Sequence, residues 1–489
     1  MSALGLDLGT SGCRAVVFDD DFTELASSQQ PYEVHRLGGG RAELDPSDVL
    51  GRVASCIRAV NALVNASDPV TVISVSALGE AVVAVDKAGQ PLGNSPVSAD
   101  LRGAEITVAI AAKLGPDHWR SLTGQPVHPM FSIGKIACWR GDRSFWDATA
   151  RVHTFADLVT TWLGGRPAID YTSAARTAAF DVTRREWSQD VLDIAGVDAS
   201  LLPEPVAVGA ALGSVTARQR SELGFAAEAA IFAGAHDQAC AFWGGGGTVR
   251  DAVFSLGTTE CLTTSSTERP EAFIQSNIAS YPVDDGAEWL SLNGIPSGGS
   301  TLHWLTGLAG RALEQVGELV ASIPDHPSPV LMLPHLAGSG TMDNDPTATG
   351  VAVGLSLTTT AEDLAAALLE SSGYELARSL AFAERAGAQF DSVRVLGGGS
   401  STLASQRRAD AADRTLTPVD GPSAARGAAA VALHGAGART SRGTERFMTG
   451  AALDPRERDR QWYRRRREQF ALLYPAIRSV VTTEEELTP

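Results

Sequence analysis

The sequence lacks the features that mark several protein classes. Its five cysteines are scattered and form no C-x-x-C pair, so neither a disulfide framework nor a structural zinc site is predicted. No apolar run is long enough to span a bilayer, and the N-terminus has no basic segment followed by an apolar stretch. The formal net charge of -17 leaves no surplus of positive charge for nucleic acid or an anionic membrane. We therefore expect a cytoplasmic protein that binds neither.

The common nucleotide-binding loops are also missing. No G-x-x-x-x-G-K-[ST] occurs, and Gly134-Lys135-Ile136 lacks both the upstream glycine and the hydroxyl residue of that motif. No G-x-G-x-x-G follows an apolar strand. A nucleotide site in this chain must therefore be built from other elements.

What is present indicates two domains of related origin. A chain of 489 residues exceeds what one hydrophobic core usually serves. Residues 6–11 (LDLGTS) and 254–259 (FSLGTT) each end an apolar run with the same turn, about half the chain length apart. This repeat predicts the duplication of one domain. We place the two domains at 1–246 and 247–489.

Patterns of apolar and turn residues predict the principal elements. We expect a helix over 46–64 with Ser47 as its N-cap. The expected strands are 4–8, 14–18, one near Leu25, 70–76, 81–86, 251–256, 260–264 and 393–396. The other expected helices are 361–386, 403–412, 424–438 and 455–478.

Three glycine-rich turns are candidates for binding a phosphate chain. Two are strand-turn-strand elements with hydroxyl residues, at 9–11 and 257–259, and the third is a strand-to-helix corner at 397–400. Glycine lets main-chain N–H groups approach a phosphate closely. Each turn taken alone is also ordinary hairpin chemistry. Taken together, the three favour a phosphate site.

Asp7 lies in an apolar strand directly before the first turn. A buried carboxylate is costly unless it is paired or bound to a metal ion. One interpretation is that Asp7 accepts hydrogen bonds from its own turn. The functional interpretation is a Mg²⁺ ligand beside the phosphates, with Arg14 on the return strand supplying positive charge.

Asp237 follows the apolar residues 230–232 and precedes a probable helix. It is therefore expected at the C-terminal end of a strand, where site residues are common. It could simply cap the helix. Beside two phosphate-binding turns, we favour the role of general base, which phosphoryl transfer to a hydroxyl requires.

These residues, in this order, resemble the FGGY-type carbohydrate kinases of the actin, Hsp70 and sugar-kinase superfamily, and the resemblance covers nearly the whole chain. The matching segments are 5–11 (GLDLGTS), 234–237 (GAHD), 255–259 (SLGTT), Gly350-x-x-x-Gly354-Leu355, 363–370 (DLAAALLE) and 397–399 (GGG).

The resemblance implies an α/β fold of two RNase-H-like (actin-like ATPase) lobes, each with a mixed sheet flanked by helices, and a central cleft. The first lobe would bind the sugar and the second the nucleotide, and the C-terminal helix could pack back on the first. It implies ATP and Mg²⁺ as cofactors, with Asp237 as catalytic base and Asp7 at the metal. The implied ATP contacts are Gly9, Thr10, Ser11 and Arg14, then Gly257, Thr258 and Thr259, then Gly299, and finally Gly398, Gly399, Ser400 and Thr402.

For the substrate, the resemblance implies Glu80, Asp100 and Arg102, with His236 beside them. We expect a small neutral sugar or polyol, such as a xylulose-, fuculose- or erythritol-like molecule, because two carboxylates would repel a sugar acid. Asp100 and Arg102 could instead merely pair with each other.

Two departures bear on which sugar is bound. Ser98 stands where many relatives have a tryptophan that walls the sugar pocket, and Gly79 stands where glycerol kinases carry a basic residue, which disfavours glycerol. The alternative function is a nucleotide-gated binding protein or chaperone-like member of the same superfamily. Whether the chain forms a homodimer is left open.

Overall fold

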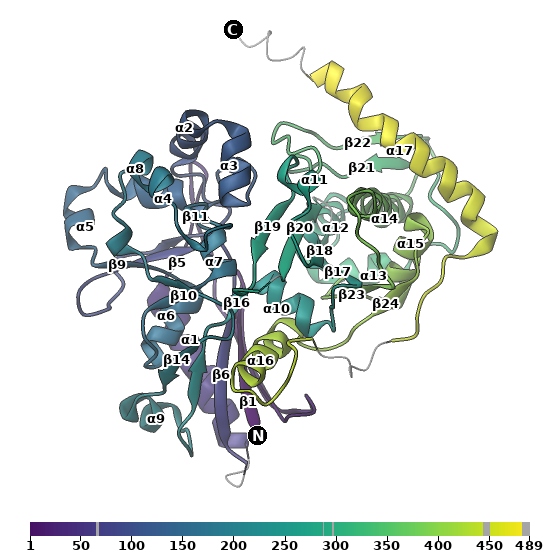
Figure 1. Cartoon of the computed structure of the whole chain (residues 1–489). Coiled ribbons are helices and arrows are strands. Elements are labelled where there is room, and N and C mark those ends of the chain that lie inside the picture. Colours follow the sequence, from purple (N-terminus) through teal and green to yellow (C-terminus); the bar gives the residue numbers. More distant parts are fainter. Residues whose placement is uncertain (65–67, 287, 296–297, 444–449, 482–489) are drawn as a thin grey trace. The chain divides into compact units, whose positions relative to one another are not determined.

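The computed structural model describes residues 1–64, 68–286, 288–295, 298–443 and 450–481 (Figure 1). The chain divides into two compact units. The first contains residues 1–247, 266–291 and 422–446, and the second contains 248–265, 292–421 and 447–489. The units are thus not simply the two halves of the chain, because two later segments return to the first unit.

The main sheet of the first unit has the strand order β14-β15-β6-β1-β2-β3. Strand β1 pairs parallel with β6 and antiparallel with β2, and the short β16 continues the pairing along β6. The bounds are Ser2–Leu8 (β1), Gly12–Phe18 (β2), Glu24–Pro31 (β3), Val70–Ala77 (β6), Ala211–Ser214 (β14), Ala230–Phe232 (β15) and Ala235–His236 (β16).

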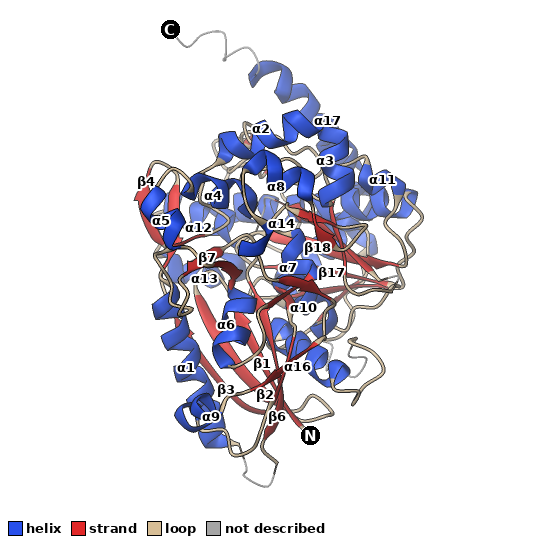
Figure 2. Ribbon diagram, turned by 60° about the vertical axis from the view of Figure 1, so that its left-hand side comes forward, coloured by secondary structure: helices blue, strands red, loops and turns tan. Residues whose placement is uncertain are grey.

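Helix α1 (Pro46–Leu63) packs on β2 and β3 (Figure 2). The predicted N-cap, Ser47, is wrong by two residues. The cap is Asp45, whose carboxylate accepts the Ser47 N–H at 2.8 Å and the Asp48 N–H at 3.4 Å. Pro46 occupies the first helical position, where its missing N–H and fixed φ suit the helix start.

The alternation of residues in β1 decides which side chains reach the site. Leu4, Leu6 and Leu8 point into the main hydrophobic core, which α1 covers. Side chains alternate along a strand, so Gly5 and Asp7 face the opposite side. The sequence Leu-Gly-Leu-Asp-Leu therefore builds the core with one face and presents a carboxylate on the other.

The face of β1 that carries Gly5 is covered by α16 (Ser423–Gly435), which also packs on β6 and α10 (Asp237–Gly244) (Figure 1). A Cβ on Gly5 would lie 1.8 Å from the carbonyl oxygen of Ala425. Gly244 and Gly427 likewise leave no room for a side chain between α10 and α16. The two helices and the strand therefore approach to backbone contact.

Smaller sheets and further helices complete the first unit. The remaining strands are His35–Gly38 (β4), Arg41–Leu44 (β5), Val82–Val85 (β7), Ser95–Pro96 (β8), Arg151–Thr154 (β9), Ala168–Asp170 (β10), Phe180–Asp181 (β11), Glu186–Trp187 (β12), Glu204–Val206 (β13) and Ala279–Pro282 (β19). The remaining helices are Ala104–Leu114 (α2), Pro116–Thr123 (α3), Ser132–Trp139 (α4), Arg143–Ala148 (α5), Phe155–Leu163 (α6), Tyr171–Ala175 (α7), Gln189–Ala195 (α8), Ala217–Leu223 (α9) and Glu271–Ile274 (α11), with a 3₁₀ turn at Ala199–Leu201.

The second unit repeats the strand arrangement of the first. In the six-stranded sheet β19-β20-β18-β17-β23-β24, strand β17 pairs antiparallel with β18 and parallel with β23. This matches β1 with its antiparallel partner β2 and its parallel partner β6. The strand bounds are Asp251–Leu256 (β17), Glu260–Ser266 (β18), Trp289–Ile295 (β20), Leu331–Leu333 (β21), Val351–Val353 (β22), Ser392–Leu396 (β23) and Leu416–Pro418 (β24).

The helices of the second unit pack on this sheet and on each other. Their bounds are Gly299–Leu308 (α12), Val316–Ala321 (α13), Ala361–Arg385 (α14), Thr402–Ala412 (α15) and Arg460–Val481 (α17), with 3₁₀ turns at Leu313–Gln315 and Glu457–Asp459. The last helix, α17, packs with α14, α15 and β21 of its own unit. The segment that returns to the first unit is α16.

Candidate active site

Asp237 is the first residue of α10 and directly follows β16. Because β16 runs parallel to β6, the chain delivers Asp237 at the C-terminal end of these strands. Its side chain is 31% exposed. Burial of the carboxyl group, with the charges of Asp7 and Glu80 nearby, raises the pKa of Asp237 to about 7. A carboxylate with this pKa can take a proton at neutral pH.

The first hairpin lines a cavity of about 490 Å³ in the first unit. The residues predicted from sequence that line it are Asp7, Gly9, Ser11 and Arg14. Thr10 is exposed at the hairpin tip. The strand register pairs Asp7 directly with Arg14, so a negative and a positive side chain flank the turn. The sequence-predicted group is thus brought together around one cavity.

Tyr32, which the motif analysis missed, braces this hairpin. Its hydroxyl donates to the carbonyl oxygen of Gly9 at 2.6 Å, and its main-chain N–H donates to the carbonyl oxygen of Ser11 at 3.2 Å. An aromatic residue just after the end of β3 carries no distinctive sequence signal. Only the fold reveals that it fixes the turn conformation.

The residues around Asp7 fit a magnesium ion. Burial raises the pKa of Asp7 to about 6, against the opposing effects of the Ser76 hydroxyl, which donates at 3.1 Å, and of Arg14. A carboxylate that is costly to ionise gains from a cation. The described residues contain no cluster of three or more acidic, histidine or cysteine groups. Mg²⁺ is commonly held by one or two carboxylates together with phosphate oxygens and water, so a single carboxylate such as Asp7 could supply one ligand.

Glu80 lies just after β6 and adopts a left-handed backbone conformation with φ of 62°. A non-glycine residue in this region is strained, and such strain gathers at functional sites. Its carboxylate forms an ion pair with Arg176, whose Nη1 also donates to Gln125 Oε1 at 2.9 Å. The Arg176 guanidinium lies 5.0 Å from the centre of the Phe131 ring.

Arg176 and Gln125 were not singled out from the sequence. Both are buried, and Gln125 Nε2 has no hydrogen-bond partner within the described part of the chain. Gln125 thus carries a buried donor that the described residues leave unpaired, next to the Arg176 guanidinium. Neither residue belongs to a recognisable motif, so only the tertiary contacts identify them.

Asp100 and Arg102 pair with each other, as the alternative considered from sequence had it. The Asp100 carboxylate has no exposed surface and accepts from Arg102 Nε and from the Ala42 N–H, both at 2.8 Å. Although burial opposes it, these bonds hold the pKa of Asp100 below its ordinary value. Arg102 also pairs with Glu43 and is 14% exposed. Of this pair, Arg102 is the one left able to touch a ligand.

Lys135 links the segments around Glu80, Val97 and Met130 through hydrogen bonds to their carbonyl oxygens. Its fully buried Nζ donates to the carbonyl oxygens of Met130 at 2.6 Å, Val97 at 2.7 Å and Glu80 at 3.2 Å. Burial lowers the pKa of Lys135 to about 8. The sequence contains only three lysines, and this one lies in an otherwise apolar helical stretch. A rare lysine within an apolar stretch was therefore the sequence signal for a buried cation with a structural role.

His236 was predicted to lie at the substrate. In the structure its Nε2 lies 3.1 Å from Asp237 Oδ1 and its Nδ1 lies 3.2 Å from the Tyr281 hydroxyl. Both ring nitrogens therefore have protein partners. Tyr281, from the segment that returns to the first unit, is fully buried and was not found from sequence.

In the second unit, the other two glycine-rich turns converge. The N–H groups of Gly299 and Ser300, at the start of α12, donate to the carbonyl oxygens of Gly257 at 2.9 Å and Thr258 at 3.1 Å. Thr258 and Thr259 are exposed at the hairpin tip. The hairpin thus rests on the N-terminus of α12.

The corner at 397–400 joins the same hairpin through Arg408. The Gly399 N–H donates to the Leu256 carbonyl oxygen at 3.1 Å. Arg408, which is 2% exposed, binds both the Gly399 carbonyl oxygen at 3.1 Å and Glu260 at 2.8 Å. Gly398 has open space around it, and Thr402 begins α15. Arg408 is a further residue that sequence reasoning missed.

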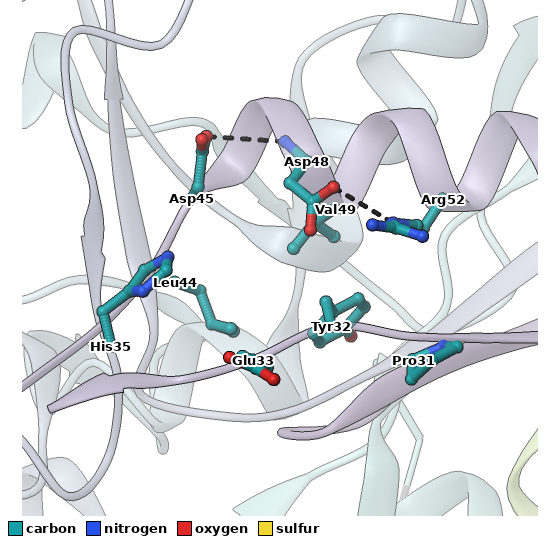
Figure 3. Close-up of a pocket in the computed structure, with 9 residues that line it drawn as sticks. All are labelled: Pro31, Tyr32, Glu33, His35, Leu44, Asp45, Asp48, Val49 and Arg52. Carbon is teal, nitrogen blue, oxygen red and sulfur yellow. Dashed lines mark hydrogen bonds and ion pairs between the residues drawn. The ribbon is translucent and has the colours of Figure 1, made fainter.

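A separate pocket of about 330 Å³ lies between the end of β3 and the start of α1 (Figure 3). None of the residues predicted for the site lines it. Its charged groups are partly paired with each other, since Arg52 Nε donates to Asp48 Oδ1 at 3.0 Å.

Among the described residues, no helix is both long and apolar enough to cross a membrane.

Comparison with known proteins assigns the family. Residues 2–244 match the N-terminal domain, and residues 252–436 the C-terminal domain, of the FGGY family of carbohydrate kinases. The chain belongs to this family. It is therefore a carbohydrate kinase, an enzyme that transfers a phosphoryl group to an alcohol acceptor. This favours the enzyme over the alternative of a nucleotide-gated binding protein.

Relatives of this kinase act on different small molecules. It is 27% identical over 448 residues to a xylulose kinase of Staphylococcus epidermidis, covering 89% of this chain and 88% of that protein. It is 30% identical over 486 residues to a glycerol kinase of Citrifermentans bemidjiense, covering 96% of each. The crystal structure of a "xyloylose kinase" from Brucella ovis is similar with a TM-score of 0.89 at 25% identity, covering 98% of this chain and 100% of that one.

Proposed function

We propose that this kinase transfers the γ-phosphate of ATP to a hydroxyl of a small neutral sugar or polyol, with Asp237 as general base. The observation that carries the proposal is the Asp237 carboxyl group itself. It lies at a strand end, is partly exposed, and has a pKa raised to about 7. A base matched to neutral pH is what proton removal from an alcohol requires.

The proposed step moves one proton to Asp237 and one phosphoryl group to the acceptor. The acceptor hydroxyl gives its proton to the Asp237 carboxylate while its oxygen bonds to the γ-phosphorus. The bond between that phosphorus and the β,γ-bridging oxygen breaks, and ADP leaves with the electron pair. Asp237 then releases its proton to solvent. The protein contributes mainly position and electrostatics, because phosphoryl transfer needs little covalent help.

For the nucleotide, we propose Gly9, Thr10, Ser11 and Arg14 in the first unit, and the turns at 257–259 and 397–400, with Gly299 and Thr402, in the second. Both hairpin tips are exposed. Asp7 would hold Mg²⁺, which when bound offsets the negative charge of the phosphates.

A neutral acceptor is supported by the charges around Glu80. Arg176 is paired with Glu80, and Arg102 is paired with Glu43 and Asp100. Both guanidinium groups are thus already matched by protein carboxylates. A substrate carboxylate or phosphate would add a negative charge to this group, whereas a hydroxyl can accept from the partly exposed Arg102 without adding charge.

Glycerol is disfavoured by the surroundings of Gly79. A Cβ on Gly79 would lie 2.9 Å from the His236 ring and 3.3 Å from Arg176 Cγ. The basic residue that glycerol kinases carry at this position would displace His236. Ser98, where many relatives have a tryptophan, removes an apolar wall from the proposed pocket, so we propose that acceptors bulkier or differently branched than xylulose are admitted as well. A ketose or polyol of the xylulose, fuculose or erythritol type remains the proposed class.

The test is ADP release with Mg-ATP across a panel of ketoses, polyols, aldoses and sugar acids. We expect turnover with a neutral polyhydroxylated acceptor and a loss of roughly 10²–10⁴-fold in Asp237→Asn. Asp190→Asn is the matched control, because Asp190 is also an acidic residue in the first turn of a helix but is exposed. Parental turnover in Asp237→Asn, or a preference for an acidic sugar, would contradict the proposal.

A further inference from the structure

Three side chains form a row that ends at Asp237, with a hydrogen bond between Tyr281 and His236 and a close N···O contact between His236 and Asp237. Tyr281 in β19 lies 3.2 Å from His236 Nδ1, and His236 Nε2 lies 3.1 Å from Asp237 Oδ1. Tyr281 has no exposed surface and His236 is 5% exposed. The row therefore runs from the core of the first unit to the partly exposed carboxyl group.

The direction of the hydrogen bonds follows from chemistry. Burial, and secondarily the Arg176 charge, hold the pKa of His236 well below its ordinary value, so the ring is neutral. A neutral imidazole donates from one nitrogen and accepts at the other. An ionised carboxylate can only accept, so its contact with Nε2 favours the tautomer in which Nε2 carries the hydrogen and faces Asp237 Oδ1. In that tautomer Nδ1 accepts from the Tyr281 hydroxyl.

The imidazole ring is held from several sides. The main-chain N–H of His236 donates to Thr172 Oγ1 at 2.8 Å. The ring meets the Tyr281 ring edge to face, with centroids 6.1 Å apart and planes at 89°. Its other side faces Gly79, where a Cβ would lie 2.9 Å from both Cδ2 and Nε2. Gly79 thus leaves the space that the ring needs.

We propose that His236 and Tyr281 are positioning residues that fix the orientation of the Asp237 carboxylate, and that His236 does not bind the acceptor. This rests on the proposed role of Asp237 as base. In the transfer step the acceptor proton goes to Asp237, while His236 and Tyr281 keep their own protons. A carboxyl group held by a fixed donor spends more time in the reactive orientation than one free to rotate.

The first test is Tyr281→Phe, which removes one hydroxyl and keeps the ring. We expect kcat to fall about tenfold while the acceptor KM and the nucleotide affinity stay within about twofold, because orientation acts on the chemical step. Tyr374→Phe is the matched control. The Tyr374 hydroxyl is also buried, and no hydrogen-bond partner for it occurs in the described ranges. It should leave kcat unchanged.

A pH profile separates positioning from a merely structural role. In Tyr281→Phe the His236 ring is held less firmly, so its Nε2–H stabilises the charged form of Asp237 less and the pKa of Asp237 rises. The acidic limb of kcat/KM should therefore move up by about half a pH unit. The other charged groups near Asp237 are Asp7 from β1, Glu80 after β6 and Arg176 after α7. All three are unchanged in Tyr281→Phe, so the shift reports the row.

A second pair of variants keeps the test decisive if one protein folds poorly. His236→Gln retains a side-chain N–H donor and should keep several-fold more kcat than His236→Leu, which has none. Adding Tyr281→Phe to His236→Leu should cause no further loss, because the two residues act through one contact.

The outcomes distinguish this inference from the proposed function. If the His236 variants raise the acceptor KM with kcat and the pH profile unchanged, His236 binds the acceptor and the inference is overturned. If Asp237→Asn is inactive but all row variants behave like the parent, the base assignment stands and the row does nothing. If Asp237→Asn is fully active, the proposed function itself fails.

Discussion

At the scale of single residues, three carboxyl groups of the first unit differ through their surroundings. Glu80 is ion-paired with Arg176. Asp7 has its pKa raised to about 6, and Asp237 to about 7, by burial above all. The Glu80 carboxylate is thus held in an ion pair, whereas burial raises the pKa of Asp7 and of Asp237, which we propose as the metal ligand and the base.

The raised pKa of Asp237 predicts the pH dependence of turnover. Only the ionised carboxylate can take a proton, so kcat/KM for the acceptor should rise with pH and level off above about pH 7. Below that value it should fall about tenfold for each pH unit. The measurement is steady-state kinetics at saturating nucleotide, with nucleotide affinity followed separately by calorimetry. A flat profile from pH 5 to 8 would exclude Asp237 as base.

The same pKa predicts that Asp237→Asn stabilises the protein at alkaline pH. Folding raises the pKa from its ordinary 3.8 to about 7, so the folded state holds the proton more tightly. The stability contributed by the protonated group is complete below pH 3.8 and lost as pH rises through 7. Thermal unfolding at pH 8 should therefore occur at a higher temperature in Asp237→Asn than in the parent.

This stability difference should shrink toward pH 4, where the parent carboxyl group is protonated. Asp190→Asn, which changes an exposed carboxylate, should show no such pH-dependent difference. Equal unfolding temperatures of Asp237→Asn and the parent at pH 8 would mean that the group is not desolvated as the structure indicates.

At the scale of elements, the glycines fall into two kinds. Gly5, Gly244 and Gly427 are required by packing, because a Cβ on each would lie 1.8 Å from a carbonyl oxygen of a neighbouring element. Gly9 and Gly257 are different. A Cβ there would meet only ordinary contacts at 3.6 and 3.4 Å, and neither has a left-handed φ. Their lack of a side chain has no structural cause within the described chain.

For the two hairpins we predict loss of binding without loss of stability. Gly9→Val and Gly257→Val should each weaken Mg-ATP binding in calorimetry, because the side chain would block the approach of phosphate to the backbone. The unfolding free energy should change by less than about 1 kcal/mol, as for most exposed substitutions. If only one variant loses affinity, only that hairpin binds phosphate, and if neither does, the nucleotide site lies elsewhere.

For the packed helices we predict the reverse. Gly427→Val inserts a branched side chain where Cys240 O would lie 1.8 Å from its Cβ, so α10 and α16 must move apart. Overpacking costs about 1–3 kcal/mol or more, measured by denaturant unfolding. Gly51→Val is the control, since Gly51 is an exposed helical glycine with no atom within 4 Å of a Cβ. Similar losses in both variants would mean that only helix propensity is lost.

At the scale of the whole molecule, the first unit needs chain segments from far along the sequence. Helix α16 covers β1 and β6, and its residues 428–433 are fully buried. Strand β19 supplies Tyr281. Without these segments, the face of β1 that carries Gly5 and Asp7 would be exposed to water. The amino-terminal half of the chain is therefore not a complete folding unit.

This predicts that a fragment of residues 1–247 lacks cooperative thermal unfolding by circular dichroism. A chain in which 266–291 and 422–443 are joined to that fragment by flexible linkers should recover a cooperative transition, because it restores the buried apolar area. A sharp transition in the fragment alone would show that α16 and β19 are dispensable for folding.

Local sequence patterns were sufficient for much of the fold. The hairpins at 9–11 and 257–259 and the strands at 70–76 and 393–396 followed from turn residues and apolar runs, and the family followed from the resemblance of the motifs in their order. The N-cap at Ser47 was wrong because Asp45, two residues earlier, accepts the Ser47 and Asp48 N–H groups and starts the helix at Pro46. Capping depends on backbone geometry that spacing alone does not specify.

The sequence by itself determined the carboxylates, the glycine turns and the order in which they occur, because these depend on residue types at short spacing. Only the tertiary structure decided the distant partners: Arg176 for Glu80, Glu43 for Arg102, and Tyr281 for His236. Tyr281 lies 45 positions from His236, and Arg176 lies 96 from Glu80. Such pairs are formed by the packing of distant segments, and no local pattern of residues encodes them.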